Sequence, residues 1–346
     1  MSIIEENRQK TAISSSLTPF QIGQHVIETP VLLAPMSGIT DLPFRQLVRR
    51  FGAGLVVSEM IASRTMISQS RESMTRATMA DEPSPRVVQL AGCDPDLLAE
   101  AAVFVEELGA DIIDINMGCP AKKVVKGLAG SALMRDLDQA TRLIEATVKA
   151  VSVPVTLKMR TGWDDDNRNA PELARRAEKA GIQMLTVHGR TRCQFYKGHA
   201  DWAFLQEVRA ATKLPLIVNG DICSVKDATQ ALELSGANGI MVGRGAQGRP
   251  WFLQQLIDHF VTGHAGPDPD IEAQGQIVLD HLNAMLVYCG DHLGVRIFRK
   301  HLGWYVERLP GGNDFRAAAV RLTDPDALRT EISKFYENQS LAGVAA

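Results

Sequence analysis

The sequence predicts an α/β fold, a TIM-type (β/α)8 barrel followed by a small all-helical C-terminal domain, and three observations agree on it. Eight short apolar runs lie between residues 31 and 245, and helical patterns such as LLAEAAVFVEEL and APELARRAEKA separate most of them. The runs are almost continuously apolar, which indicates parallel strands buried on both faces. After about residue 256 only helical periodicity remains. Eight repeats at this spacing favour a closed barrel over an open doubly wound sheet.

The elements of this barrel can be placed along the chain in order. The predicted strands are VLLAPM (31–36), GLVVSEM (54–60), RVVQLAG (86–92), DIIDINMG (111–118), PVTLKMR (154–160), MLTVHGR (184–190), LPLIVNG (214–220) and GIMVGRG (239–245). The segment FQIGQHVIETP before them is typical of a hairpin, which we expect to plug the bottom of the barrel. HAGPDPD has the composition of a linker. We therefore expect a polar N-terminal extension (1–20), a barrel (21–256) and a helical domain (257–346).

The composition is that of an ordinary soluble globular protein, with 346 residues, 45% hydrophobic and 22% charged. No apolar run approaches the roughly 20 residues that a membrane span needs, and the polar N-terminus shows no secretory signal. Five scattered cysteines without a C-x-x-C predict a reducing cytoplasm, with neither disulfides nor structural zinc. The acidic run at 164–166 has no histidine at ligand spacing, so we expect a solvated loop and no metal site.

Polar or reactive groups follow nearly every predicted strand. In a barrel of this kind the active site lies at the C-terminal ends of the strands, so these groups should converge on one mouth. They are Pro35, Met36, Ser37, Glu59, Gln89, Asn116, Met117, Gly118, Cys119, Pro120, Lys158, Met159, Arg160, His188, Gly189, Arg190, Asn219, Gly220, Asp221, Gly243 and Arg244. An inert scaffold would not need them there, and we predict a functional site at this mouth.

The last two strand ends predict a phosphate site. NGD and VGRGAQGRP supply backbone N–H groups, the cation of Arg244 and a helix start near Pro250. The stretch also contains G-x-G-x-x-G, but no second parallel strand follows, so a Rossmann site is rejected. Lys158 ends an apolar strand and must be paired or lose its charge. It either stabilises a reduced flavin, with Gln89 and Asn116 bonding to ligand edges, or forms a structural ion pair. His188 contacts either the flavin and its phosphate or only the protein.

Cys119 lies in NMGCPAKKVVKGLAG, a loop rich in Gly and Lys that we expect to be mobile and basic. A cysteine between Gly and Pro has no packing role that Ala or Val would not fill better. A thiol beside a flavin can donate a proton to a carbon that receives hydride on its other face, which is general acid catalysis, provided that the thiol keeps its proton. We expect Cys93, Cys223 and Cys289 to be small buried hydrophobes.

Two basic groups lie outside the strand ends. The loop carries Lys122, Lys123 and Lys126, and the pattern VRIFRKHLGWY places Arg296, Arg299 and Lys300 on one helix face. Each group is either a solvated surface or a phosphate-binding patch. The net charge of −3 counts against a nucleic-acid partner, although phosphate contact needs only local positive charge.

Several of these motifs together resemble the bacterial B branch of the tRNA-dihydrouridine synthases over residues 20–310. They are APMSGITDLPFR, NMGCPAKKVVKGLAGSALM, LKMRTGWDD, TVHGRTR, NGDI and VGRGAQGRPW, of which NMGCP followed by GSALM is highly specific. The resemblance implies a cytoplasmic enzyme that is monomeric on tRNA, with NADPH or NADH reducing a bound FMN. Hydride would pass to C6 of a D-loop uridine and Cys119 would protonate C5.

The resemblance also implies roles for individual residues. Those expected to hold FMN are Pro35, Met36, Ser37, Gln89, Lys158, His188, Asn219, Gly220, Asp221, Gly243 and Arg244. Those expected to contact the uridine or the tRNA are Asn116, Lys122, Lys123, Lys126, Arg160, Arg296, Arg299 and Lys300. One alternative is a flavin barrel that reduces a free pyrimidine, similar to dihydroorotate or dihydropyrimidine dehydrogenases, and another is a non-catalytic RNA-binding barrel. The basic helical domain favours tRNA over the first, and the full set of strand-end groups favours an enzyme over the second.

Overall fold

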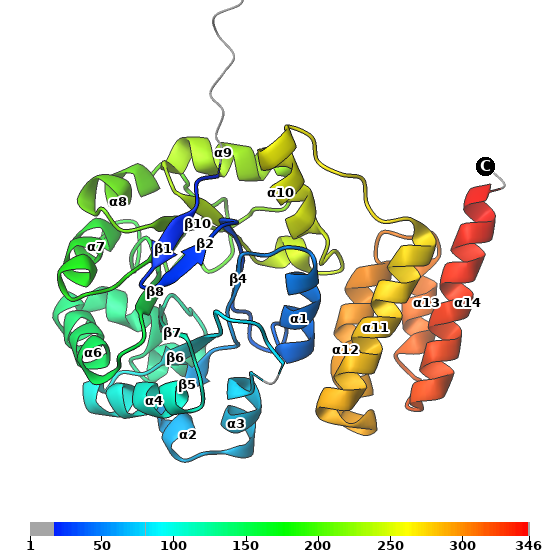
Figure 1. Cartoon of the computed structure of the whole chain (residues 1–346), viewed down its shortest axis with the longest axis horizontal. Coiled ribbons are helices and arrows are strands. Elements are labelled where there is room, and N and C mark those ends of the chain that lie inside the picture. Colours follow the sequence, from blue (N-terminus) through cyan, green and yellow to red (C-terminus); the bar gives the residue numbers. More distant parts are fainter. Residues whose placement is uncertain (1–16, 80, 345–346) are drawn as a thin grey trace, which may run out of the picture.

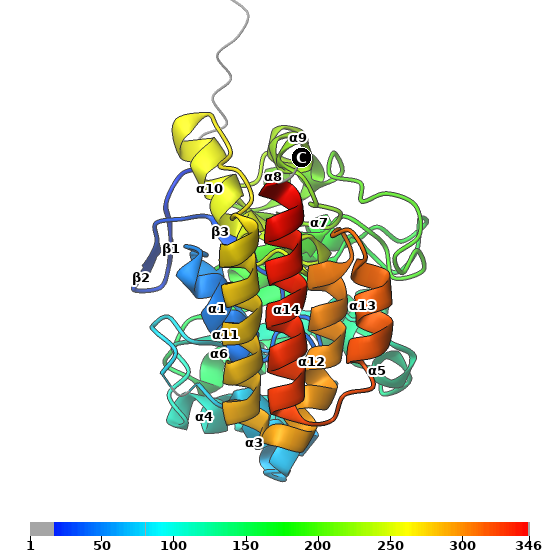
Figure 2. The same ribbon diagram turned by 90° about the vertical axis from the view of Figure 1, so that its right-hand side faces the viewer.

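The protein is described by a computed structural model that covers residues 17–79 and 81–344. Most of the predicted N-terminal extension, residues 1–16, lies outside the described residues. The remainder consists of a barrel and, beside it, a bundle of helices (Figures 1 and 2).

Parallel strands form the barrel wall, and all eight predicted strands are confirmed. The wall is built from β3 (Val31–Leu33), β4 (Leu55–Val56), β5 (Ile61–Ala62), β6 (Val87–Ala91), β7 (Ile112–Met117), β8 (Val155–Arg160), β9 (Leu185–His188), β10 (Leu216–Asn219) and β11 (Gly239–Val242). Their order is β4-β3-β11-β10-β9-β8-β7-β6-β5. A parallel bridge between Val57 and Val87 closes the ring.

The predicted second strand (54–60) is shorter than expected, because only β4 lies within it and β5 follows it. Between them the N–H of Ser58 donates to the carbonyl of Val87 at 3.0 Å, and the Ser58 hydroxyl accepts from the N–H of Gln89, also at 3.0 Å. The side-chain oxygen thus takes the place of a backbone carbonyl in the ladder. This irregular turn allows Glu59 and Met60 to leave the strand direction at the barrel mouth.

Helices cover the outside of the barrel. They are α1 (Leu42–Arg50), α2 (Ser63–Ile67), α3 (Arg71–Ala77), α4 (Pro95–Glu107), α5 (Lys122–Lys126), α6 (Leu137–Ala150), α7 (Ala170–Lys179), α8 (Leu205–Ala211), α9 (Val225–Ser235) and α10 (Phe252–Thr262), with 3-10 turns η1 (Gly130–Arg135) and η2 (Arg244–Ala246). Several begin at a residue whose side chain accepts an N–H of the first turn, such as Asp41, Asp94 and Ser224. Except for the short exposed helix α5, their apolar faces bury the outer sides of the strands.

The predicted hairpin is present as β1 (Phe20–Ile22) and β2 (His25–Ile27), which pair antiparallel. Phe20, Ile22 and Ile27 are buried in one cluster with inward-facing strand residues such as Leu32 and Met241. The hairpin therefore plugs the barrel interior from the end opposite the site, as predicted, and Figure 1 shows it lying across the strands.

The helical domain consists of α11 (Ile271–Cys289), α12 (Asp291–Val306), α13 (Gly312–Ala319) and α14 (Pro325–Val344), with a core of its own. The boundary expected at residue 256 falls within α10, which contacts β3 and α9 of the barrel, so the first helix of the domain begins at Ile271. The domain packs against α1 (Figure 1). None of the described helices has the length and apolarity needed to cross a membrane.

Candidate active site

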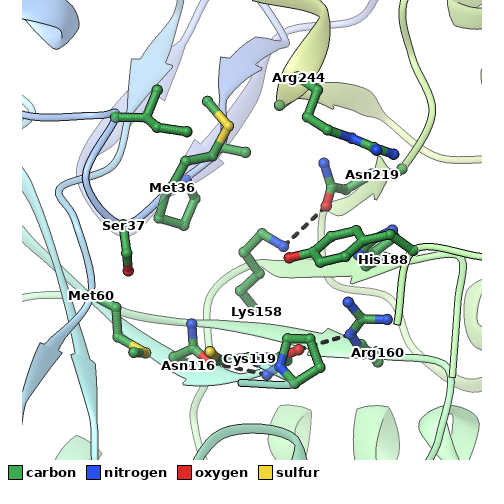
Figure 3. Close-up of a pocket in the computed structure, with 18 of the residues that line it drawn as sticks. Met36, Ser37, Met60, Asn116, Cys119, Lys158, Arg160, His188, Asn219 and Arg244 are labelled. Atoms are coloured by element: carbon green, nitrogen blue, oxygen red, sulfur yellow. Dashed lines mark hydrogen bonds between the residues drawn. The ribbon is translucent and has the colours of Figure 1, made fainter. Parts of the chain in front are cut away.

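A cavity of about 460 Å³ opens at the C-terminal ends of the strands. Every residue predicted to hold the flavin lines it, together with Asn116, Cys119 and Arg160 (Figure 3). The closed barrel explains this convergence, because it brings strand ends that are far apart in sequence to one rim. Further lining residues that the sequence analysis did not assign to the site are Ala34, Ile39, Met60, Ala121, Phe195, Tyr196, Ile222, Cys223 and Gln247.

Lys158 extends from β8 into the cavity, where its ammonium donates to Oδ1 of Asn219 at 3.0 Å. The amide of Asn219 is oriented for this contact because its nitrogen donates to the carbonyl of Met241 at 2.7 Å. Burial lowers the pKa of Lys158 to about 8, and the charge of Arg160 acts in the same direction. No ion pair involves Lys158 among the described residues, so the structural ion pair that we considered is not formed. The ammonium is left as a cation facing the cavity.

A buried carboxylate orders the polar floor of the site. Asp114 of β7 accepts from the hydroxyl of Thr156 and from the amide of Gln89, both at 2.6 Å. The other end of Gln89 accepts from Nδ2 of Asn116 at 2.8 Å. Burial raises the pKa of Asp114, and these hydrogen bonds oppose the rise. Because each amide is held at both ends, the side-chain oxygen of Asn116 must face the loop that follows β7.

That loop carries Cys119, and its backbone is held on both sides. Oδ1 of Asn116 accepts from the N–H groups of Gly118 and Cys119 at 3.1 and 2.9 Å. The carbonyl of Cys119 accepts from the N–H and the hydroxyl of Ser131 at 3.1 and 2.8 Å. Gly130 has a φ of +59°, and a Cβ there would lie 2.9 Å from the Cys119 carbonyl. The NMGCP and GSALM motifs therefore form one unit that presents the half-buried thiol at the mouth (Figure 3).

Arg160 is buried, and it joins two loops of the mouth. Its Nε donates to the carbonyl of Gly118 at 2.8 Å, and its Nη1 donates to the carbonyls of Thr191 and Phe195, both at 2.9 Å. Burial lowers its pKa to about 10. Backbone carbonyls accept from most of its N–H groups, so Arg160 fixes the loops that follow β7 and β9. Its positive charge lies beside the cavity.

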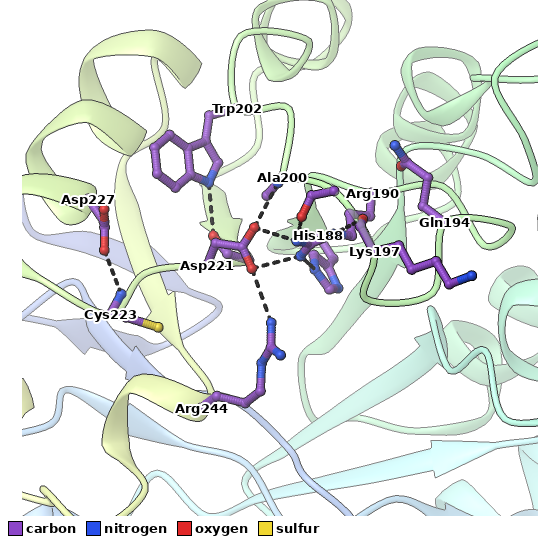
Figure 4. Close-up of polar contacts among 12 residues, drawn as sticks. His188, Arg190, Gln194, Lys197, Ala200, Trp202, Asp221, Cys223, Asp227 and Arg244 are labelled. Carbon is purple, nitrogen blue, oxygen red and sulfur yellow. Dashed lines mark hydrogen bonds and ion pairs between the residues drawn. The ribbon is translucent and has the colours of Figure 1, made fainter. Parts of the chain in front are cut away.

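Asp221 is the centre of a network that the sequence did not reveal (Figure 4). One oxygen accepts from Arg190 at 2.8 Å and from Arg244 at 3.1 Å, and the other accepts from Arg190 at 2.5 Å and from the N–H of Ala200 at 2.8 Å. Arg190 is only 2% exposed and also donates to the carbonyls of Lys197 and Gly198. The acid predicted to bind cofactor thus holds the arginines of the site in position.

His188 faces the same cavity. Burial and the nearby cations, Arg160 and Lys158 foremost, hold its pKa well below the usual value, so the ring is neutral. The next strand end passes directly beside it, because Gly220 has a φ of +113° and a Cβ there would lie 2.6 Å from Cδ2 of His188. Only glycine permits this approach.

Tyr196 lies on the loop after β9, and nothing in the sequence pattern singled it out. Its ring lies 5.6 Å from the guanidinium of Arg160 and 5.3 Å from that of Arg244, distances that permit cation–π attraction. The ring is 57% exposed. It therefore forms a flat apolar surface at the rim of the cavity.

The phosphate corner predicted after β10 and β11 is geometrically open. Arg244 is 53% exposed beside it, and within the described part of the chain the N–H groups of Gly243 and Arg244 donate to no backbone carbonyl. A Cβ at Gly245 would lie 2.4 Å from the carbonyl of Ile222, so glycine lets the two loops meet. Unpaired N–H groups, a guanidinium and the ammonium of Lys158 fit an anionic ligand that carries a phosphate.

One cysteine prediction is wrong. Cys223 is exposed and lines the cavity, whereas we expected a buried hydrophobe. The chain turns outward at Asp221, whose φ is +56°, and this places Cys223 at the rim, where its N–H donates to Asp227 at 3.1 Å. Cys93 and Cys289 are half-buried, and all five cysteines are free.

The predicted basic residues have different surroundings. Lys122, Lys123 and Lys126 form the exposed helix α5 next to the Cys119 loop, and Arg296 is exposed on α12. Arg299 donates to the carbonyl of Leu322 at 2.9 Å, and Lys300 donates to the carbonyl of Gly38 at the mouth.

The acidic run at 164–166 forms a turn. Asp164 accepts from the N–H of Asn167 at 3.0 Å, and Asp165 and Asp166 are exposed, as expected for a solvated loop. In residues 17–79 and 81–344, no three His, Cys, Asp or Glu side chains are placed to hold a metal ion.

Comparison with known proteins assigns the family. The dihydrouridine synthase (Dus) family profile matches residues 32–340. The chain is 56% identical over 317 residues to a probable tRNA-dihydrouridine synthase of Rickettsia bellii, covering 91% of this chain and 97% of the relative. It is 49% identical over 332 residues to tRNA-dihydrouridine synthase B of Pseudomonas aeruginosa, covering 94% and 99%. The predicted resemblance to the B branch is confirmed.

Solved structures support the barrel fold at low sequence identity. Histamine dehydrogenase from Rhizobium sp. 4-9 superposes with a TM-score of 0.53 at 12% identity, covering 78% of this chain and 51% of the other. An old yellow enzyme homologue from Zymomonas mobilis gives 0.52 at 15% identity, covering 75% and 95%. The chain therefore belongs to the dihydrouridine synthase family, which consists of flavin-dependent oxidoreductases that reduce uridines in tRNA.

Proposed function

We propose that this protein uses FMN, reduced by NADPH, to hydrogenate the C5–C6 bond of D-loop uridines in tRNA, with Cys119 as the proton donor. The observation that carries the proposal is the arrangement of one cavity. The Cys119 thiol, whose backbone is held by Asn116 and Ser131, lies at one side of it. The ammonium of Lys158 lies inside it, and an open phosphate corner lies at Gly243 and Arg244.

The residues of the cavity fit FMN in three parts. The phosphate corner supplies N–H groups and Arg244, Lys158 supplies a cation for the ring, and the β3 loop supplies an apolar wall through Pro35 and Met36. Ser37, Gln89, His188, Asn219, Gly220 and Asp221 complete the set. When bound, FMN supplies the hydride that C6 of the uracil receives. Lys158 keeps its proton most readily when an anion lies beside it, because burial otherwise lowers its pKa to about 8.

The residues of this chain carry out the second half of the addition to the C5–C6 bond, which is the proton transfer to C5. The Cys119 thiol donates its proton to C5 from the face opposite the hydride, and the S–H bond breaks as the C5–H bond forms. Asn116 fixes the thiol's backbone through two N–H groups. Arg160 secures the same loop through the Gly118 carbonyl. The uridine must leave the folded tRNA to reach this cavity, as base-modifying enzymes require.

The tRNA backbone is held by surface charge in this proposal. The exposed lysines of α5 lie beside the thiol loop, and Arg296 lies on the helical domain, which we assign to tRNA binding. The protein acts as a monomer on tRNA in the cytoplasm, and no metal takes part.

The decisive experiment is Cys119→Ala. We expect the variant to keep bound flavin and NADPH oxidation, while dihydrouridine formed on unmodified tRNA falls by roughly 10²-fold or more, the usual contribution of a general acid. Cys93→Ala, at a half-buried thiol outside the cavity, is the matched control. Normal product formation by Cys119→Ala would remove the proton-donor role. Reoxidation of the reduced protein by free uracil or orotate but not by tRNA would favour a free-pyrimidine reductase.

A further inference from the structure

The tip of the loop between β3 and α1 is held by two different parts of the molecule. Lys300 of α12 donates to the carbonyl of Gly38, and the N–H of the same Gly38 donates to the carboxylate of Glu59. Gly38 has a φ of +72°, and a Cβ there would lie 3.1 Å from the ammonium of Lys300. Glycine at this position thus lets the lysine reach the backbone.

This loop forms one wall of the cavity. Its residues Met36, Ser37 and Ile39 line the pocket, and Met60, next to Glu59, lines it as well. Internal bonds close the turn, because Met36 donates to the Thr40 hydroxyl at 2.8 Å and the N–H groups of Ile39 and Thr40 donate to the Met36 carbonyl. A compact turn of this kind moves as a unit, so a tether at its tip fixes the wall that faces the ligand.

Lys300 lies on a helix that is packed against α1. On α12 its neighbour His301 is buried and packs 5.3 Å from the ring of Phe44 on α1. The loop itself runs into α1 through Asp41, whose carboxylate accepts from the N–H of Phe44 at 3.1 Å. The helical domain therefore packs against α1, into which the loop runs, and contacts the tip of the loop through Lys300.

The N–H side of the loop tip at Gly38 is held by Glu59, which is itself buried. Glu59 is 7% exposed and lies 3.9 Å from the guanidinium of Arg76. The ammonium of Lys300 thus binds the carbonyl of Gly38, and the carboxylate of Glu59 binds its N–H. Each charge meets a backbone group of opposite partial charge. A lysine that served only to bind phosphate would not need a hydrogen bond to the Gly38 carbonyl.

From these contacts we propose that Lys300 is a positioning residue of the flavin site. It holds the Met36–Asp41 loop against the cofactor and thereby couples the helical domain to the flavin pocket, instead of serving mainly as a tRNA phosphate contact. The assignment rests on the proposed function, since it takes the occupant of the cavity to be FMN.

The test uses the full-length holoenzyme without tRNA, a condition in which a phosphate contact is silent. Lys300→Met keeps the aliphatic stem and removes the donor. We expect FMN to bind roughly fivefold more weakly, the scale of one lost hydrogen bond, with a changed rate of flavin reduction by NADPH. Lys300→Arg keeps a cationic donor and should restore both values. Lys334→Met removes an exposed lysine of α14 and should leave both unchanged.

A double variant tests the shared tip. Because Lys300 and Glu59 hold the same residue, the fold-changes of Lys300→Met and Glu59→Gln should not multiply in the combined variant. Independent effects, or wild-type FMN affinity and reduction rate in Lys300→Met, would overturn the assignment even if tRNA binding weakened. Wild-type protein that takes up no FMN would instead overturn the proposed function and this assignment together.

Discussion

Asp221→Asn tests most directly whether the carboxylate of Asp221 stabilises the buried arginine of the site. Asparagine matches aspartate in shape and tolerates the left-handed backbone at this position, where φ is +56°. Each carboxylate oxygen accepts from Arg190, at 2.8 and 2.5 Å. Whichever way the amide turns, its NH2 group must therefore face a guanidinium N–H, so the variant removes the negative charge and one of the two acceptors together.

The expected cost follows from the exposure of the partners. Arg190 is 2% exposed and loses its counter-ion, whereas Arg244 is 53% exposed and contributes little. Removing one partner of a buried pair costs about 3–5 kcal/mol, and the 22% exposure of Asp221 favours the lower value, about 3 kcal/mol. For a domain of this size we expect the Tm to fall by roughly 6 °C.

Thermal unfolding followed by circular dichroism measures this loss, with Asp138→Asn as the control. Asp138 is 77% exposed in its pair with Arg176, and its loss should cost at most about 0.5 kcal/mol. A Tm for Asp221→Asn within roughly 1 °C of wild type would refute the reasoning, because Arg190 would then not need its carboxylate.

The Asp221–Arg190 pair also predicts how the stability of the protein changes with pH. Burial, the largest single influence, would raise the pKa of Asp221. The hydrogen bonds from Arg190 and from the N–H of Ala200, together with the charges of Arg190 and Arg244, outweigh it and leave the pKa below the ordinary 3.8. A carboxyl with a lowered folded-state pKa contributes its stability above the unfolded value and loses it as the pH falls through the folded one. The stability gap between wild type and Asp221→Asn should therefore be full at neutral pH and close as the pH falls below 3.8.

Three further predictions concern the cavity and its rim. Because the pKa of Lys158 is lowered to about 8, its charge is lost as the pH rises through that value, so FMN affinity by fluorescence titration should fall there in wild type and stay flat in Lys158→Met. Gly220→Ala places a Cβ 2.6 Å from His188 and should cost about 2–3 kcal/mol in chemical denaturation. Gly198→Ala, at a φ of +63° in open space, should cost only about 1 kcal/mol. Replacing the three lysines of α5 with alanine should reduce the salt dependence of tRNA binding by a slope of about 2, measured as log Kd against log salt concentration; an unchanged slope would place the phosphate contacts elsewhere.

Much of the fold could be predicted because barrel geometry follows from local pattern. Each buried strand appears as an apolar run, and the turn residues of the β1–β2 hairpin identify it without tertiary information. The early end of the second strand could not be predicted, because the run GLVVSEM is strand-like throughout. The interruption depends on the Ser58 hydroxyl accepting from β6, which is a contact between elements.

The site was predictable to the extent that it lies on strand ends. Position after a strand locates Lys158 and Asn219 at the rim, but it does not show that they bond to each other. Arg190 was placed at a strand end but given no role, because an arginine after a strand looks the same whether it is solvated or buried. Its burial depends on Asp221, 31 residues away. Tyr196 lies on a loop, where no periodicity indicates the direction of a side chain.

The charge distribution resolves the objection raised by the net charge of −3. Lys158, Arg160, Arg190 and Arg244 meet at the mouth, where the nearby carboxylates are Asp114 and Asp221. The mouth therefore carries an excess of positive charge although the chain is acidic. At the surface, however, Arg299 and Lys300 are committed to backbone carbonyls. Lys300 is exposed despite this bond, whereas the α5 lysines and Arg296 are exposed and form no such bond among the described residues. Because so few cations remain, tRNA selection in our proposal must depend more on whether a uridine can enter the cavity than on attraction to the phosphate backbone.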